Sequence, residues 1–231
     1  MIKTVIFDID NTLYDFDHAN LNALDALGDY AQEHFGWEKA SFIERNRDMM
    51  RKMHEKMGDV SAYHNRVIRF QNMLEEAGLP LYPHALAMYG LYWDTVLKTA
   101  VISPGAAETM KELKERGLQI GIGTDMTTWI QLRKLETLGL LTYVDFLVSS
   151  EEAGVEKPHR ELFELCAAKA GCEPSECLFI GDSLARDYHG ALNAGMKALW
   201  FDPPGGTFLS GDPGDEPVEK ISRMKEVLSY L

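Results

Sequence analysis

MIKTVIFDIDNTLY, residues 1–14, contains a short apolar run that ends abruptly at a carboxylate. The run at 5–7 has the length and the β-branched content of a buried strand. Asp8 follows it directly, Asp10 comes two residues later, and Thr12 two residues after that. Because residues two apart on an extended chain face the same side, both carboxylates can approach one centre. Buried carboxylates are costly unless they are compensated, so this stretch predicts a bound hard cation.

The two aspartates also have a structural interpretation. In the functional interpretation, one carboxylate is a nucleophile or metal ligand and the other is an acid or base. In the structural one, a strand ends in an acidic turn, where Asp10 and Asn11 bond to nearby backbone groups. The first fourteen residues do not choose between the two.

Composition excludes several classes of protein. The chain has 231 residues, 45% of them apolar, which fits one large domain or a domain with a smaller one. Its net charge of −13 argues against a partner that is a nucleic acid or a membrane surface. The three cysteines lack metal-ligand spacing, and no leader or membrane-spanning stretch is apparent. We therefore expect a cytoplasmic protein with a small-molecule partner, while the sequence indicates no oligomeric state.

Two kinds of pattern follow the opening stretch. Residues 17–98 show helical periodicity, which predicts a module of about four helices. Beyond them, apolar runs alternate with helical segments closed by glycine, which predicts an α/β fold with a parallel sheet of about five strands. The strands are expected at 2–8, 118–124, 144–148, 177–180 and 197–201. A loop rich in Gly, Pro and Asp is expected at 203–217 and an amphipathic helix at 218–231.

The helical module is inserted directly after the first strand. We therefore expect a core domain at 1–16 and 99–231 and a helical domain at 17–98. Ligands of parallel α/β sheets bind outside the carboxyl ends of the strands. Asp8, Thr124 and Asp182 each end a different predicted strand, so three distant segments bring polar groups to one edge. The module leaves from this same edge and can fold over it.

The segment that ends at Thr124 suits an anion. Gly121 and Gly123 let the backbone approach a ligand, and a hydroxyl with backbone N–H groups at a strand-to-helix turn suits phosphate oxygens. The alternative is that Thr124 merely caps a helix. Asp125 places a carboxylate where an anion would bind, and a site that only binds phosphate would not be expected to have an acid there.

Two further segments supply charge. Lys157 precedes a proline, which restricts its backbone, and it would provide the cation that admits a phosphate among carboxylates. Asp182 ends a strand and can join Asp8 at a metal, while Asp187 can support a ligand or bind Lys157. The alternatives are a solvated lysine and an ordinary acid at a helix N-terminus.

The chain resembles the haloacid dehalogenase superfamily of phosphohydrolases, whose four motifs appear in order as Asp8-Ile-Asp10-Asn-Thr12, Thr124, Lys157-Pro158, and Gly181-Asp182-Ser183 with Asp187. These motifs span nearly all of the core, and their combination is specific. The resemblance implies a Rossmann-like core and makes the module at 17–98 a mobile α-helical cap. It implies an enzyme whose cofactor is Mg²⁺.

The resemblance also implies roles. Asp8 would attack phosphorus and form an aspartyl-phosphate, and Asp10 would act as acid and then as base. Mg²⁺ would be held by Asp8, by the backbone carbonyl of Asp10 and by Asp182. The phosphoryl group would be bound by Thr124, Lys157 and the Asp125 segment. Asp187 would support the metal site, and Thr12 and Ser183 are further supporting residues. Asp125 departs from the family, which often has asparagine there, so the role of its side chain is open, and one candidate role is to accept a hydrogen bond from a substrate hydroxyl.

These implications predict a Mg²⁺-dependent phosphatase of a small phosphorylated metabolite. A dehalogenase is a rival, but it needs no acid at the position of Asp10. A phosphomutase would share all four motifs, and a catalytically silent binding module is the alternative from another class. The substrate is not identified. Specificity should come from the cap and the segment after Asp10, where the candidates, each with a solvated or core role as its alternative, are Tyr14, Phe16, His54, His64, Arg66 and Arg69.

Overall fold

The opening stretch forms a central strand of a parallel sheet. The computed structural model describes residues 1–58, 60–204 and 211–231, and in it β1 (Thr4–Phe7) has a hydrogen-bonded neighbour on each side. All four residues of β1 are buried, as expected for a strand that is covered on both faces. The described strands follow the order β3-β2-β1-β4-β5-β6, and each adjacent pair is parallel. The prediction of an α/β fold with a parallel sheet is confirmed.

The other strands are β2 (Gln119–Thr124), β3 (Phe146–Ser149), β4 (Cys177–Gly181), β5 (Lys197–Phe201) and β6 (Lys220–Ile221). The helices between them are α5 (Ala106–Glu115), α6 (Thr128–Thr137), α7 (Ser150–Ala153), α8 (Arg160–Ala170) and α9 (His189–Asn193). Short 3₁₀ or π segments are η2 (Leu141–Tyr143), η3 (Pro174–Glu176), η4 (Leu184–Tyr188) and η5 (Met224–Ser229).

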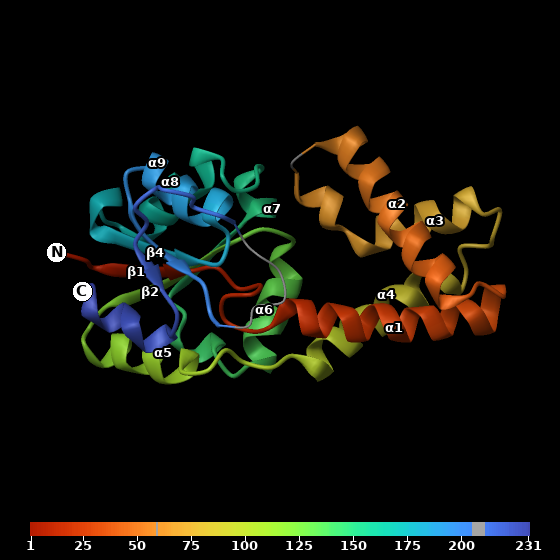
Figure 1. Ribbon diagram of the computed structural model, residues 1–231, viewed down its shortest axis with the longest axis horizontal. Coiled ribbons are helices and arrows are strands. Elements are labelled where there is room, and N and C mark those ends of the chain that lie inside the picture. Colours follow the sequence, from red (N-terminus) through yellow and green to blue (C-terminus); the bar gives the residue numbers. More distant parts are fainter. Residues whose placement is uncertain (59, 205–210) are drawn as a thin grey trace. The chain divides into compact units, whose positions relative to one another are not determined.

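Helices cover both faces of this sheet (Figure 1). On one face α8 packs against β2 and β3, and α9 packs against β5, whereas α5 lies on the other face with η5. An apolar cluster joins Ile6 of β1, Phe179 of β4 and Phe163 of α8. Burying a side chain of this size contributes roughly 1.5–3 kcal/mol, so the core fixes the strands and with them their carboxyl ends.

The chain forms two compact units, Met1–Asp15 with Val101–Leu231, and Phe16–Ala100. The second unit is helical and contains α1 (Phe16–Phe35), α2 (Lys39–Met57), η1 (Ser61–His64), α3 (Arg66–Glu76) and α4 (His84–Thr99). Within it α1 packs against α2 and α4, and α3 packs against α2 and α4 (Figure 1). Among the described residues, no helix is both long and apolar enough to cross a membrane. That the helical unit acts as a mobile cap stays a prediction.

The end of the chain differs from the expectation. The helix predicted at 218–231 is wrong: residues 220–221 form β6, and a 3₁₀ segment follows at 224–229. The backbone explains the strand, because Trp200 N donates to Glu219 O and Asp202 N donates to Ile221 O, both at 2.9 Å. The buried residues Ile221, Met224 and Val227 recur every third position, a spacing that a 3₁₀ turn also satisfies. Residues 205–210 of the expected loop lie outside the described residues.

Candidate active site

Three aspartates meet at the carboxyl edge of the sheet. Asp8 directly follows β1, and its backbone N donates to Ile180 O of β4 at 2.9 Å, which fixes it beside the end of that strand. Asp8, Asp182 and Asp187 each offer a carboxylate oxygen, and these oxygens lie within 4.8 Å of one another. Gly181 makes this approach possible, because a Cβ at that position would stand 2.3 Å from Asp187 Cγ.

Lys157 is the cation of this cluster. Its side chain is 3% exposed, and its Nζ donates to Asp8 Oδ1 at 2.7 Å and to Asp187 Oδ1 at 2.6 Å. The backbone holds it in place, because Lys157 N donates to Asp125 Oδ1 at 3.0 Å and its carbonyl accepts a bond from Arg186 Nε. The sequence left two roles open for Asp187, binding Lys157 or supporting a ligand. The structure shows the contact with Lys157.

The cluster has more negative than positive charge. Burial raises the pKa of Asp8 to about 7 against the attraction of Lys157, and the neighbouring Asp187 and Asp10 raise it further. Burial, followed by the charges of Asp187 and Asp8, raises the pKa of Asp182 to about 8. With all three carboxylates ionised, one ammonium would leave excess negative charge, and a bound cation would favour that ionised form. Carboxylate oxygens are ligands that Mg²⁺ accepts, so the residues present fit the implied ion.

Asp10 is bound apart from these three carboxylates. Lys134 Nζ donates to its two oxygens at 2.7 and 2.8 Å, and the Tyr14 hydroxyl donates to Oδ1 at 2.6 Å. Burial acts to raise the pKa of Asp10, but the Lys134 ammonium outweighs it and the net pKa is below the ordinary value. The Asp10 side chain is thus held as a carboxylate. The contact of its backbone carbonyl with a metal stays a prediction.

Sequence reasoning missed Lys134, which lies on α6 and is 1% exposed. A signal was present, because the buried residues of α6 are Ile130, Gln131, Lys134 and Leu135, the spacing of one helix face. A lysine on the apolar face of a helix requires a buried partner, and Asp10 is that partner.

Gln131 connects Asp10 to the end of β2. Its Nε2 donates to Thr124 Oγ1 and to Asp125 O, both at 2.7 Å, and it lies 3.5 Å from Asp10 Oδ2. The Asp125 carboxylate accepts a bond from Arg186 Nη2 as well as from the backbone of Lys157. Burial raises the pKa of Asp125 against the attraction of Lys157 and Arg186. The contacts give Asp125 a positioning role, while its predicted contact with phosphate stays a prediction.

The remaining predicted residues occupy supporting positions. Thr12 is fully buried, and its hydroxyl has no hydrogen-bond partner among the residues that the structure describes. Ser183 N donates to Asp187 Oδ2 at 2.9 Å, and its hydroxyl accepts a bond from Arg186 N at the start of η4. Of the specificity candidates, Tyr14 contacts Asp10, whereas Arg66 and Arg69 are buried inside the helical unit.

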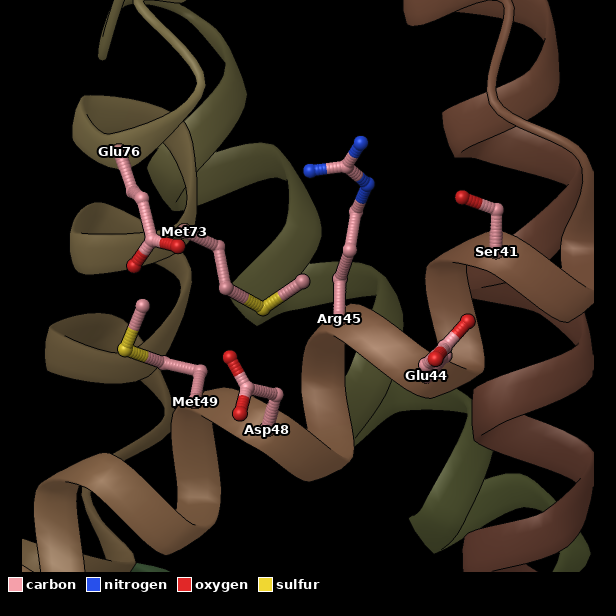
Figure 2. Close-up of a pocket in the computed structure, with 7 residues that line it drawn as sticks. All are labelled: Ser41, Glu44, Arg45, Asp48, Met49, Met73 and Glu76. Carbon is pink, nitrogen blue, oxygen red and sulfur yellow. The ribbon is translucent and has the colours of Figure 1, made fainter.

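A pocket of about 320 Å³ lies between α2 and α3 in the helical unit (Figure 2). None of the predicted site residues lines it; the lining residues are Ser41, Glu44, Arg45, Asp48, Met49, Met73 and Glu76. Asp48 is paired with Arg51 and Lys52, and Glu76 with Lys52. These carboxylates are already satisfied at the surface, so we assign the pocket no chemistry.

The chain is similar in sequence and in fold to known proteins. A model of the haloacid dehalogenase-like hydrolases matches residues 2–195. The ribulose-1,5-bisphosphate 5-phosphatase of Halopiger xanaduensis is 39% identical over 88% of this chain and 86% of its own. The glyceraldehyde 3-phosphate phosphatase of Methanopyrus kandleri is 30% identical over 100% of this chain and 97% of its own. A 2-haloacid dehalogenase structure from Pseudomonas syringae matches with a TM-score of 0.80 at 24% identity, covering 99% of this chain and 97% of its own, which shows a shared fold.

Proposed function

The chain belongs to the haloacid dehalogenase-like hydrolases, and from that premise we propose that it is a Mg²⁺-dependent phosphatase of a small phosphorylated sugar. That it is a phosphatase follows from its curated relatives, which are phosphatases. The metal, the substrate class and the covalent intermediate are what we propose beyond this. Cys166, Cys172 and Cys177 are free thiols, which supports a cytoplasmic location.

One observation carries the proposal: the site separates its carboxylates into two environments. Asp8 belongs to the cluster with Asp182 and Asp187, whereas the Asp10 side chain is bound by Lys134 and Tyr14. Two carboxyl groups in different environments are the arrangement that lets one act as nucleophile and the other as acid or base. A binding module has no need for this separation.

The chemistry proceeds in two halves. In the first, an Asp8 oxygen forms a bond to phosphorus, the bond from phosphorus to the ester oxygen breaks, and Asp10 gives its proton to that oxygen. In the second, Asp10 takes a proton from water, whose oxygen attacks phosphorus, so that phosphate leaves and Asp8 is regenerated. The second half requires Asp10 as a carboxylate, and its contact with Lys134 favours that form. The first half requires a protonated Asp10, which this contact opposes, so we assign the geometry seen to the second half.

The other residues position charge. Asp8, Asp182 and Asp187 would hold Mg²⁺, together with the backbone carbonyl of Asp10. When bound, this ion neutralises charge on the phosphoryl oxygens and on the cluster. Lys157 supplies a fixed positive charge beside the nucleophile. Gln131 orients the Thr124 hydroxyl, which is proposed to hold a phosphoryl oxygen.

A phosphate-release assay tests this function. We expect wild type to release phosphate from a panel of sugar phosphates with Mg²⁺ and to lose that activity with a chelator. Asp8→Asn should lower the rate by about 10³-fold or more, because the nucleophile is removed. The matched control is Asp145→Asn, since Asp145 is paired with Lys114 on the surface. Equal phosphate release by wild type and Asp8→Asn on every substrate would falsify the proposal, and conversion to an isomeric sugar phosphate would identify the phosphomutase.

A further inference from the structure

Two of the three cysteines lie in contact where α8 joins β4. Cys172 follows the glycine that ends α8, Cys177 is the first residue of β4, and their sulfur atoms are 3.4 Å apart. Both thiols are free in the structure. The parallel strands begin at this edge of the sheet and end at the opposite edge, where the aspartates lie. The mechanism uses neither cysteine, so their contact requires its own explanation.

The chain between the two cysteines keeps them close together. The left-handed turn at Gly171 ends α8, and Cys172 N then donates to Ala167 O at 3.4 Å. In the segment that follows, Glu176 N donates to Glu173 O at 2.9 Å, and Glu173 N donates to the Glu176 carboxylate at 3.3 Å. These reciprocal bonds fix η3, so a short and ordered loop separates the two thiols.

The two thiols differ in their access to solvent. Cys172 is partly exposed, whereas Cys177 is fully buried. Burial, and then the hydrogen bond with Cys172, raises the pKa of the Cys177 thiol. A thiol attacks a disulfide as its thiolate, and the disulfide must also reach it. Cys172 is therefore the sulfur that reacts first, and Cys177 lies behind it in position to react second.

Cys166 has the environment of a structural cysteine. It lies on α8 in the apolar cluster with Phe163 and Phe179, and its side chain is fully buried. Burial raises the pKa of its thiol to about 12. Cysteines buried in apolar surroundings are inert toward reagents in solution. Cys166 therefore serves as an internal control for the other two thiols.

We propose that Cys172 and Cys177 are a site of reversible oxidation, which a small-molecule disulfide converts into an intramolecular disulfide bond. In the first step, the Cys172 thiolate attacks one sulfur of the small disulfide, whose S–S bond breaks and releases one thiolate. In the second, the Cys177 sulfur loses its proton to solvent and attacks Cys172 Sγ, which releases the other thiolate. Two cysteine thiols are thus oxidised, and one small disulfide is reduced to two thiols.

The new bond links the end of α8 to the start of β4. Thr4 at the start of β1 also contacts this place, because its Oγ1 lies 3.6 Å from Cys172 Sγ. A cross-link restricts the unfolded chain, so the oxidised protein should melt at a temperature higher by roughly 5 °C for a loop this short. Disulfides of cytosolic proteins are mostly transient and redox-sensing, which agrees with thiols that are free until a small disulfide oxidises them. The site is separate from the aspartates, so the inference does not rest on the proposed function.

Incubation of the folded protein with oxidised glutathione tests the site. After alkylation and digestion, mass spectrometry should find one bond, between Cys172 and Cys177, and dithiothreitol should restore both thiols. Cys166→Ala is the matched control and should form the same bond as wild type. Cys172→Ser should take up no glutathione, whereas Cys177→Ala should keep glutathione bound to Cys172 as a mixed disulfide.

Three results would overturn the oxidation site. They are glutathione that stays on Cys172 of wild type, a bond that includes Cys166, and three thiols that all remain free. If Cys177→Ala does not fold, wild type and Cys172→Ser decide between the same outcomes. The melting temperature tests the cross-link itself: a rise in oxidised wild type that is absent from Cys172→Ser supports it, and an unchanged or lower value contradicts it.

Discussion

Both units bury charge: among the described residues, the core unit contains a cluster of three aspartates with one lysine, whereas the buried charges of the helical unit are those of two arginines. In the core unit, Lys157 lies between Asp8 and Asp187, and Asp182 adds a third carboxylate. In the helical unit, Arg66 donates to neutral oxygens and lies over the rings of Tyr92 and Trp93. Nε and Nη2 of Arg69 have no hydrogen-bond partner among the described residues. The carboxylate cluster of the core unit suits a cation.

The core unit also contains a buried ion pair in which one positive charge faces one negative charge. Lys134 and Asp10 form a one-to-one ion pair, completed by the Tyr14 hydroxyl. Nothing in that pair requires a further ion. A buried charge that is paired inside the protein therefore gives no indication of a ligand, whereas a cluster of like charges is costly to bury and is relieved by a counter-ion. Removal of one charge from the core cluster, from the Asp10–Lys134 pair or from an exposed pair should have effects of decreasing size.

The largest effect is expected for Lys157→Met. Removing the ammonium leaves Asp8 and Asp187 buried without their cation, and breaking a buried pair in this way costs about 3–5 kcal/mol of unfolding free energy. Activity should fall about 10²- to 10³-fold, because a fixed charge beside the reacting phosphoryl group is lost. Chemical unfolding and phosphate release measure the two effects.

Addition of Mg²⁺ provides a second test of the core cluster. The variant cluster is more negative than the native one, so Mg²⁺ should stabilise Lys157→Met more than it stabilises wild type. Lys114→Met is the control, because Lys114 forms an exposed pair with Asp145. If Lys157→Met and Lys114→Met lose the same small amount of stability, the core cluster is not a buried, unbalanced site.

Lys134→Met should lower kcat about 10- to 100-fold with little change in KM, because Asp10 loses the group that holds it as a carboxylate. Lys134→Arg should restore part of kcat, since it keeps the charge. Tyr14→Phe removes a single hydrogen bond to Asp10 and should have the smaller effect. Steady-state kinetics separate the two constants, and a change confined to KM would contradict the positioning role.

Asp182→Asn should weaken stabilisation by Mg²⁺. A ligand at 100 times its Kd stabilises the folded state by about 2.7 kcal/mol, and the variant should show clearly less than wild type at the same concentration. The cause is the loss of one negative charge and one strong oxygen ligand. Titration of the unfolding midpoint with Mg²⁺ measures the effect, and an unchanged increment would remove Asp182 from the metal site.

The smallest effect is expected at an exposed pair. Lys114 Nζ lies 2.6 Å from Asp145 Oδ1, and Asp145 Oδ2 accepts a bond from Ile120 N. Burial opposes ionisation, but these contacts lower the pKa of Asp145 overall. Its contribution is therefore present above the unfolded pKa of about 3.9 and is lost as pH falls through the lower folded value.

Asp145→Asn should accordingly cost about 1 kcal/mol at pH 7 and less near pH 3, as measured by urea unfolding at both pH values. We attribute the expected difference in lost unfolding free energy between Asp145→Asn and Lys157→Met to the burial of the Lys157 cluster. If Asp145→Asn lowers the unfolding free energy as much as Lys157→Met does, the loss of an ion pair, and not its burial, determines the size of the effect.

Much of the core and its edge was predictable, because short-range patterns encode it. The apolar run at 5–7 and the glycine-terminated helices predicted a parallel sheet, and parallel sheets place the ends of their strands together. The structure of residues 218–231 was not predictable in this way. Its apolar spacing satisfies more than one helical geometry, and pairing of residues 220–221 with β5 decided against an α-helix.

The partners of the charged residues were the least predictable part of the site. Lys134 lies 124 residues from Asp10 in the sequence, and Lys157 lies 149 residues from Asp8. The family resemblance assigned Lys157 to the site, but no motif in it marked Lys134 or Gln131. An amphipathic pattern indicates that a polar residue is buried without identifying its partner.

By itself, the sequence indicated a buried strand that ends at a carboxylate, and it predicted that Thr124, Lys157 and Asp182 belong to the same site. Only the tertiary structure decided how the charges divide: Asp8 lies with Lys157 and two other aspartates, and Asp10 lies with Lys134. The physical reason is range. Strand and helix patterns arise from neighbours a few residues apart, whereas charges are balanced through space, by groups that the fold brings together.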